Sequence, residues 1–142
     1  MSHDQKIVVV MPAYNAAKTL RITYADLPPA LVDQVILVDD GSSDDTVKIA
    51  RELGLELFVH NRNYGYGANQ KTCYRLALAA DADIIIMIHP DYQYTPQLIP
   101  AMAALVGRGT AFMCVGSHSA RLTTRVSTDS PRQMRVPAAM AR

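Results

Sequence analysis

The sequence has few cysteines and no long apolar run, and each absence excludes a class of protein. Cys73 and Cys114 are the only cysteines in 142 residues, and their spacing matches neither a metal site nor a disulfide framework. No stretch approaches the roughly 18 apolar residues of a membrane-spanning helix. The N-terminus also lacks the basic and apolar regions of a signal peptide. We therefore expect reduced thiols, no membrane span and a cytoplasmic location.

Charge of one sign is also lacking. The formal net charge is +1, which gives no field strong enough to favour nucleic acid as a partner. The distribution of charge is uneven, however. Residues 1–116 carry nine Lys and Arg against twelve Asp and Glu, whereas residues 117–142 carry five Arg and one acid, Asp129. The two segments therefore differ in the sign of their net charge.

Short apolar runs alternate with segments of helical period along the first segment. The predicted strands are residues 7–11, 35–38, 55–59, 83–88 and 112–115, and the predicted helices are residues 15–26, 45–53, 68–80 and 96–106. This alternation is typical of βαβ units that build a parallel sheet covered on both faces. We predict one α/β domain over residues 1–116.

The pattern stops at Ser117. Ser, Thr, Arg and Pro dominate residues 117–142, and no apolar period of 2 or 3.6 remains. Such composition favours an irregular or disordered tail. A second interpretation is that the natural sequence is lost after residue 116, through a shifted reading frame or a truncation.

Polar side chains follow four of the predicted strands, where an open α/β sheet binds its ligand. They lie in residues 12–15, 39–42, 61–65 and 89–93. The turn after the first strand contains no glycine, which excludes a dinucleotide-binding loop, and Gly-Lys-Ser/Thr after a strand is also missing. A phosphorylated ligand would therefore need another device to hold its charge.

A divalent cation is one such device. Asp91 directly follows the most apolar predicted strand, and carboxylate, amide and water oxygens suit Mg²⁺ or Mn²⁺. Gln93 can direct its carbonyl oxygen to the same side if the backbone there is extended. The alternative is that Asp91 only forms a turn with Pro90 and Tyr92.

Four motifs, in this order and spacing, resemble those of family 2 glycosyltransferases. They are Val10-Met11-Pro12-Ala13-Tyr14-Asn15, Val38-Asp39-Asp40-Gly41-Ser42-Ser43-Asp44-Asp45-Thr46, Asn63-Tyr64-Gly65 and the strand-terminal Asp91. The bacterial and polyprenyl-phosphate sugar synthase branch is the most similar. The resemblance covers about residues 5–116 and implies a GT-A fold, a Rossmann-like three-layer α/β sandwich with a mainly parallel sheet.

The resemblance also implies a nucleotide-sugar site. The matching positions are Pro12, Ala13, Tyr14, Asn15, Asp39, Asp40, Gly41, Ser42, Asn63, Gly65 and Lys71. Residues 12–14 would line the base, largely through backbone groups, and Asp39 or Asp40 would accept a hydrogen bond from the base or ribose. Lys71 would approach the diphosphate, unless it is a solvated lysine on a helix surface.

The implied metal site departs from the family pattern. Asp91 matches the second acid of the Asp-x-Asp motif, and Gln93 matches a glutamine of polyprenyl-phosphate sugar synthases. His89 replaces the first acid, and imidazole suits Mg²⁺ less well than carboxylate does. The candidate ligands of Mg²⁺ or Mn²⁺ are therefore Asp91, Gln93 and His89. Ala16 stands where an acidic residue often follows the Tyr-Asn pair.

The implied activity is transfer of a sugar, with inversion, from a nucleotide-diphosphate sugar to an acceptor. A polyprenyl phosphate is one candidate acceptor and a glycan another, and the former would bring the protein to the inner face of the membrane. The general base lies after the fifth strand in the family, and the sequence does not identify it. The alternatives are an inactive nucleotide-binding module and a nucleotidyltransferase, although the latter's glycine- and lysine-rich loop is absent. An unpaired fifth strand would also favour self-association.

Overall fold

The computed structural model describes residues 5–91, 96–107, 113–116 and 122–125. The strands are β1 Ile7–Ala13, β2 Gln34–Asp39, β3 Glu56–Val59, β4 Ile84–Met87, β5 Met113–Gly116 and β6 Leu122–Arg125. The helices are α1 Leu20–Ala25, α2 Thr46–Glu52, α3 Tyr66–Ala79, the 3₁₀ turn η1 Pro96–Leu98 and α4 Ile99–Gly107. Within these ranges no helix has the length and apolarity to cross a membrane.

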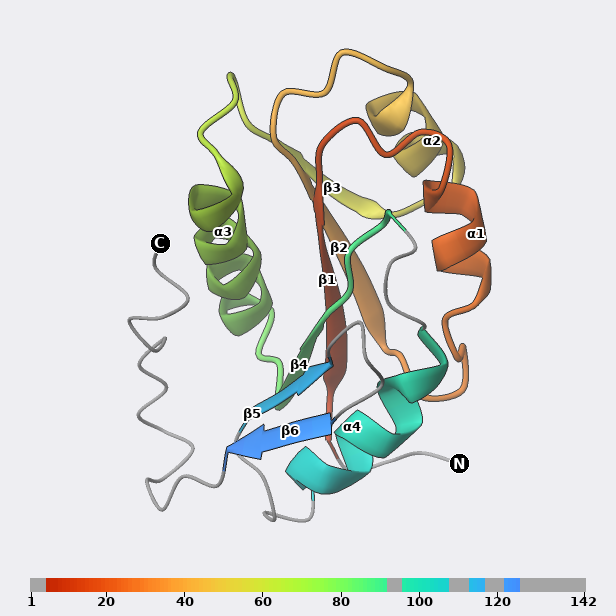
Figure 1. The fold of residues 1–142 in the computed structure, drawn as a ribbon, viewed down its shortest axis with the longest axis vertical. Helices are drawn as coiled ribbons and strands as arrows, with labels where there is room; N and C mark the ends of the chain where they lie inside the picture. The colour runs from red at the N-terminus through yellow and green to blue at the C-terminus, as the bar shows by residue number, and fades with distance from the viewer. Residues whose placement is uncertain (1–4, 92–95, 108–112, 117–121, 126–142) are drawn as a thin grey trace.

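The first four strands form one parallel sheet in the order β3-β2-β1-β4. Figure 1 shows α3 on one face of this sheet and α1, α2 and α4 on the other. All seven residues of β1 are buried, because helices cover both of its faces. Asp33 and Asp83 fix the start of β1: their carboxylates accept hydrogen bonds from the backbone N–H groups of Ile7 and Lys6, at 2.8 and 2.7 Å.

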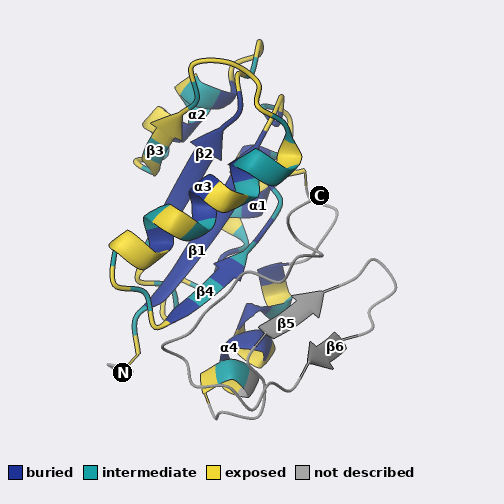
Figure 2. Ribbon diagram, turned by 90° about the vertical axis from the view of Figure 1, so that its left-hand side faces the viewer, coloured by how far each residue is buried: buried dark blue, intermediate teal, exposed yellow. Residues whose placement is uncertain are grey.

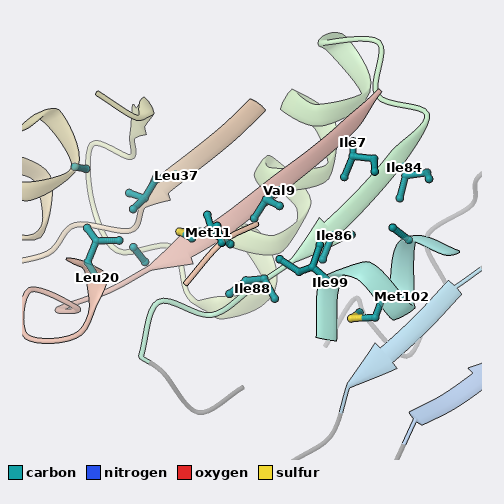
Figure 3. Packing of buried hydrophobic residues seen from close by; sticks show 14 residues of the cluster. Ile7, Val9, Met11, Leu20, Leu37, Ile84, Ile86, Ile88, Ile99 and Met102 are labelled. Carbon is teal, nitrogen blue, oxygen red and sulfur yellow. The ribbon is translucent and has the colours of Figure 1, made fainter. Parts of the chain in front are cut away.

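Alternate side chains of β1 belong to two apolar clusters, as the pleat of a strand requires. Val8 and Val10 pack with Cys73 and Ala77 of α3, and Figure 2 shows α3 across this face with exposed residues on its outer side. The residues in between belong to the larger cluster (Figure 3). Its labelled members are Ile7, Val9, Met11, Leu20, Leu37, Ile84, Ile86, Ile88, Ile99 and Met102.

Cys73 lies fully buried in the smaller cluster as a free thiol. Burial raises the pKa of this thiol to about 12. It therefore stays protonated at neutral pH and is a poor nucleophile and metal ligand.

The structure differs in two details from the pattern in the sequence. The fifth predicted strand does not join the parallel sheet, because β5 pairs antiparallel with β6. β6 also lies within residues 117–142, for which we predict irregular structure. Four residues are too few to give a detectable period, and a strand this short depends on its partner. The other residues of that segment lie outside the described ranges. β5 and β6 form a separate two-stranded sheet, and the self-association expected from the sequence stays a prediction.

The first helix begins later than its predicted start at Asn15. The described helix begins at Leu20, and Asn15 adopts a left-handed backbone conformation with φ of 49°. A residue in that conformation cannot continue into a right-handed helix. Asn15 instead forms hydrogen bonds with the loop after β2, which brings that loop to the end of β1.

We expect Leu37→Ala to lower the free energy of unfolding by about 3 kcal/mol, because it leaves a cavity in the larger cluster. Leu37 is fully buried, whereas Ile22 on α1 is 52% exposed. The matched change Ile22→Ala should cost less than about 0.5 kcal/mol. Urea unfolding followed by circular dichroism measures both losses. Similar losses for the two variants would contradict this description of the core.

Candidate functional site

A pocket of about 290 Å³ lies at the carboxyl ends of the parallel strands, the upper end of the sheet in Figure 1. Residues from the ends of β1, β2 and β4 and from the loop and first turn around the start of α3 surround it. They are Pro12, Ala13, Tyr14, Ala16, Asp40, Asn63, Gly65, Tyr66, Asn69, His89, Pro90 and Asp91. Parallel strands bring segments far apart in sequence to this one edge.

The structure places the predicted site residues in two groups. Eight line the pocket, namely Pro12, Ala13, Tyr14, Asp40, Asn63, Gly65, His89 and Asp91. Five do not line it, namely Asn15, Asp39, Gly41, Ser42 and Lys71. Gln93 lies outside the described residues. Sequence reasoning missed Ala16, Tyr66, Asn69 and Pro90. Tyr66 and Asn69 lie three residues apart in the first turn of α3, and this spacing puts them on one side of the helix. They directly follow the predicted site residue Gly65, which is the signal that could have identified them.

The loop after β2 is tied to the turn after β1. The backbone N–H of Asn15 donates to Ser42 Oγ at 2.8 Å, and the N–H of Ser43 donates to Asn15 Oδ1 at 2.9 Å. The N–H of Ala16 donates to Thr46 Oγ1 at 2.9 Å. Asn15 and Ser42 therefore hold two loops together and do not face the pocket.

Asp44 closes the same loop. Its carboxylate accepts hydrogen bonds from the hydroxyl and the N–H of Thr46 and from the N–H of Ala17. Desolvation acts to raise the pKa of Asp44, but the hydrogen bonds from Thr46 and Ala17 outweigh it and lower that pKa. The Asp-x-Thr part of the motif is thus a clamp at the start of α2, satisfying N–H groups that the helix leaves unpaired.

Asp39 and Asp40 have different roles, although they are adjacent and both nearly buried. Asp39 Oδ2 accepts the N–H groups of Gly41 and Ser42 at 3.1 and 3.0 Å, which forms the turn after β2. Among the described residues Asp39 Oδ1 has no hydrogen-bond partner. Asp39 does not line the pocket, and its carboxylate shapes the backbone of the loop.

Asp40 lines the pocket and holds the loop before α3. Its Oδ1 accepts the N–H of Tyr64 at 2.9 Å and lies 2.8 Å from His60 Nδ1, and its Oδ2 accepts the N–H of Gly65 at 2.9 Å. An ionised carboxylate offers about four acceptor positions. Asp40 Oδ2 can therefore accept one more hydrogen bond, and Asp40 borders the pocket.

Tyr66 and His89 both line the pocket and form a stacked pair. Their ring centroids are 5.3 Å apart with an interplanar angle of 28°, and Tyr66 Oη lies 2.8 Å from His89 Nε2. Gln70 Nε2 donates to the same Oη at 2.7 Å. Burial lowers the pKa of His89, and the nearby Asp91 carboxylate opposes this only in part, so the imidazole is neutral at pH 7.

A hydrogen bond from the residue before α1 holds the turn that carries Asp91. Thr19 Oγ1 donates to the carbonyl oxygen of Pro90 at 2.5 Å. Asp91 is exposed and lines the pocket. The described residues contain no group of three or more His, Cys, Asp and Glu that could enclose a metal ion. A cation here would take most of its ligands from a bound molecule or water.

The parallel sheet with helices on both faces agrees with the predicted GT-A fold, and solved glycosyltransferase structures with a TM-score of about 0.6 share it, which confirms the prediction. The chain belongs to glycosyl transferase family 2, whose family model matches residues 8–137. This match confirms the resemblance carried by the four sequence motifs, and it extends past residue 116.

Two curated relatives come from archaea. An uncharacterised protein of Methanocaldococcus jannaschii is 35% identical, with 82% of this chain covering 48% of that protein. The UDP-N-acetylglucosamine–dolichyl-phosphate N-acetylglucosaminyltransferase of Methanococcus voltae is 29% identical, with 81% of this chain covering 53% of that one. The chain thus spans about half the length of these relatives.

A solved structure of similar fold is glucosyl-3-phosphoglycerate synthase from Mycobacterium tuberculosis, in complex with Mn²⁺, UDP-glucose and phosphoglyceric acid. The TM-score is 0.62 at 27% identity, with 75% of this chain covering 41% of that one. That enzyme therefore binds a nucleotide sugar and a divalent metal in a related fold.

We expect Gly41→Ala to destabilise the protein more than Gly54→Ala. Both glycines have a left-handed backbone, with φ of 79° and 71°, so each change costs about 1 kcal/mol through strain. Only at Gly41 would the added Cβ also lie 3.0 Å from a backbone atom, the nitrogen of Asn63. Urea unfolding of both variants measures the difference, and equal losses would contradict the close approach of the two loops.

Proposed function

We propose that this chain is the donor-binding part of a glycosyltransferase. The donor is a nucleotide-diphosphate sugar, and the sugar is transferred with inversion. The observation that carries the proposal is the position of two carboxylates, Asp40 after β2 and Asp91 after β4, in one pocket lined by all the predicted strand-end segments. Two carboxylates suit two parts of such a donor, the nucleoside and the diphosphate. One accepts hydrogen bonds from the nucleoside, and the other holds the cation that neutralises a diphosphate.

The nucleoside binds on the side of Pro12, Ala13, Tyr14 and Asp40. Asp40 is the better of the two adjacent acids for this role, because it lines the pocket and its Oδ2 accepts only the N–H of Gly65. An N–H of the base or a ribose hydroxyl would take the remaining acceptor position. The UDP-glucose in the mycobacterial neighbour supports uridine as the first nucleoside to test.

The metal, Mg²⁺ or Mn²⁺, binds at Asp91, with Gln93 as a further candidate ligand. His89 also borders this side of the pocket, but coordination by its Nε2 would require breaking the bond to Tyr66 Oη. When bound, the cation stabilises the negative charge that develops on the leaving nucleoside diphosphate. The hydrogen bond between Thr19 and the Pro90 carbonyl fixes the turn that presents the Asp91 carboxylate. The carboxylate therefore loses less conformational freedom when the cation binds.

A polyprenyl phosphate is the acceptor that the sequence relatives support. The Methanococcus voltae relative is named for a dolichyl-phosphate acceptor. A lipid phosphate is already an anion at neutral pH and needs no general base to become a nucleophile. Such an acceptor would bring the protein to a membrane surface.

We expect UDP to bind at least about tenfold more tightly with Mn²⁺ than without it, a difference of about 1.4 kcal/mol. Calorimetry with UDP, GDP and dTDP, with and without Mn²⁺, measures this and ranks the nucleosides. Asp91→Asn should abolish the Mn²⁺ effect, because the amide removes the charge that attracts the cation. The metal-independent part of UDP binding should remain.

Asp81→Asn is the matched control. Asp81 is exposed in the turn before β4, at the opposite edge of the sheet, and its left-handed φ of 57° is one that Asn tolerates. This variant should keep the full Mn²⁺ effect. Absence of metal-dependent binding for all three nucleotides would exclude the proposed donor site. Tight binding without sugar transfer to polyprenyl phosphate or a glycan would identify a binding module instead.

A further inference from the structure

His60 connects the pocket carboxylate of Asp40 to helix α3. It directly follows β3, and its backbone N–H donates to the carbonyl oxygen of Asp39 at 2.9 Å. Its Nδ1 lies 2.8 Å from Asp40 Oδ1, and its Nε2 lies 2.9 Å from Thr72 Oγ1. The side chain of His60 is only 9% exposed and that of Asp40 only 4%. His60 does not line the pocket, so it reaches a ligand only through Asp40.

The imidazole of His60 is held at both nitrogens and at its ring. An ionised carboxylate only accepts hydrogen bonds, so Nδ1 is the donor to Asp40. Thr72 serves the other nitrogen and anchors it to α3, where its hydroxyl also lies 3.1 Å from the carbonyl oxygen of Ala68. Phe58 and Tyr64 meet the ring edge to face, with centroids 5.8 and 5.2 Å away. These contacts fix the direction of the Nδ1–H bond.

Asp40 needs this third donor to keep a defined orientation. Its other two donors, the N–H groups of Tyr64 and Gly65, belong to the same short loop before α3. That loop is itself held by Asp40, so carboxylate and loop determine each other's position. The backbone of Asp40 is fixed separately, because its N–H donates to the carbonyl oxygen of Ala13 at 2.9 Å. His60 is the side-chain contact that holds the carboxylate relative to the sheet, because the backbone of His60 is itself bonded to the end of β2. Without it, the Asp40 side chain can rotate together with the loop.

We propose that His60 is a positioning residue for nucleotide recognition, which orients Asp40 so that Oδ2 meets a donor group of the nucleoside. This role rests on the proposed function of the pocket. It predicts that the affinity for the nucleotide depends on the Nδ1 contact of His60 and not on its Nε2 contact. A purely structural histidine would not distinguish the two nitrogens.

Two amide variants separate the two contacts. In His60→Asn the side-chain nitrogen can occupy the position of Nδ1 and donate to Asp40, but it no longer reaches Thr72. In His60→Gln the longer side chain places its amide near the position of Nε2, within reach of Thr72, and loses the contact with Asp40. Both variants lose the ring contacts with Phe58 and Tyr64, so packing is matched.

Calorimetry with UDP and Mn²⁺ on the 142-residue chain tests the role. We expect His60→Asn to bind UDP within about threefold of the unchanged chain, and His60→Gln to bind it at least about tenfold more weakly. Thermal unfolding should give similar midpoints for the two variants. Equal UDP affinities for Asn and Gln would overturn the role of His60 while leaving the donor site intact. No UDP binding by the unchanged chain would overturn the donor site itself, and this role with it.

A second measurement needs no variant and decides the matter if either one fails to fold. In the unchanged chain with ¹⁵N-labelled histidine, the Nδ1–H of His60 should give a downfield proton resonance that is protected from exchange with water. Adding UDP should shift this resonance, because a new donor at Asp40 Oδ2 changes the charge on the carboxylate that Nδ1–H faces. A resonance unchanged at saturating UDP would overturn the proposal.

Discussion

The burial of β1 on both faces is the constraint on which the rest of the structure depends. All seven of its residues are buried, so the strand must pair on both edges and be covered by helices on both faces. Pairing in parallel with β2 and β4 brings the segments that follow these strands to one edge of the sheet. The pocket forms there because each of these segments directly follows a buried strand and carries polar side chains.

Most polar groups at that edge form hydrogen bonds with one another, and few remain for a ligand. Asp39, Asp44 and Asn15 bind backbone N–H groups of neighbouring loops. Asp39 and Asp40 are both nearly buried, and burial of a carboxylate is costly unless hydrogen bonds compensate it. Most of the Asp-Asp-Gly-Ser-x-Asp-x-Thr motif therefore builds the loops, and the acceptor capacity that remains at the pocket belongs to Asp40. A motif that marks a binding site thus consists mainly of residues that hold its backbone.

The two sides of the pocket differ in how rigidly they are held. Asp40 is fixed by the loop before α3 and by His60, whereas Asp91 lies exposed on a turn that Thr19 anchors through the Pro90 carbonyl. A group that forms directional hydrogen bonds with a nucleoside gains from a fixed orientation. A carboxylate that binds a hydrated cation gains from access to solvent. Beside Asp91, the stacked Tyr66 and His89 form a neutral, hydrogen-bonded ring pair at the position where the family pattern has a further acid.

The sequence alone determined the α/β class, the four parallel strands, the family and most pocket residues, because apolar period and strand-end motifs are local signals. It could not assign different roles to Asp39 and Asp40, which are adjacent and chemically identical. It also missed the start of α1, the β5–β6 pairing and Tyr66. Only the tertiary structure decided these, because each depends on a partner distant in sequence: Asn15 on Ser42, β5 on β6, Tyr66 on His89, and Asp40 on His60.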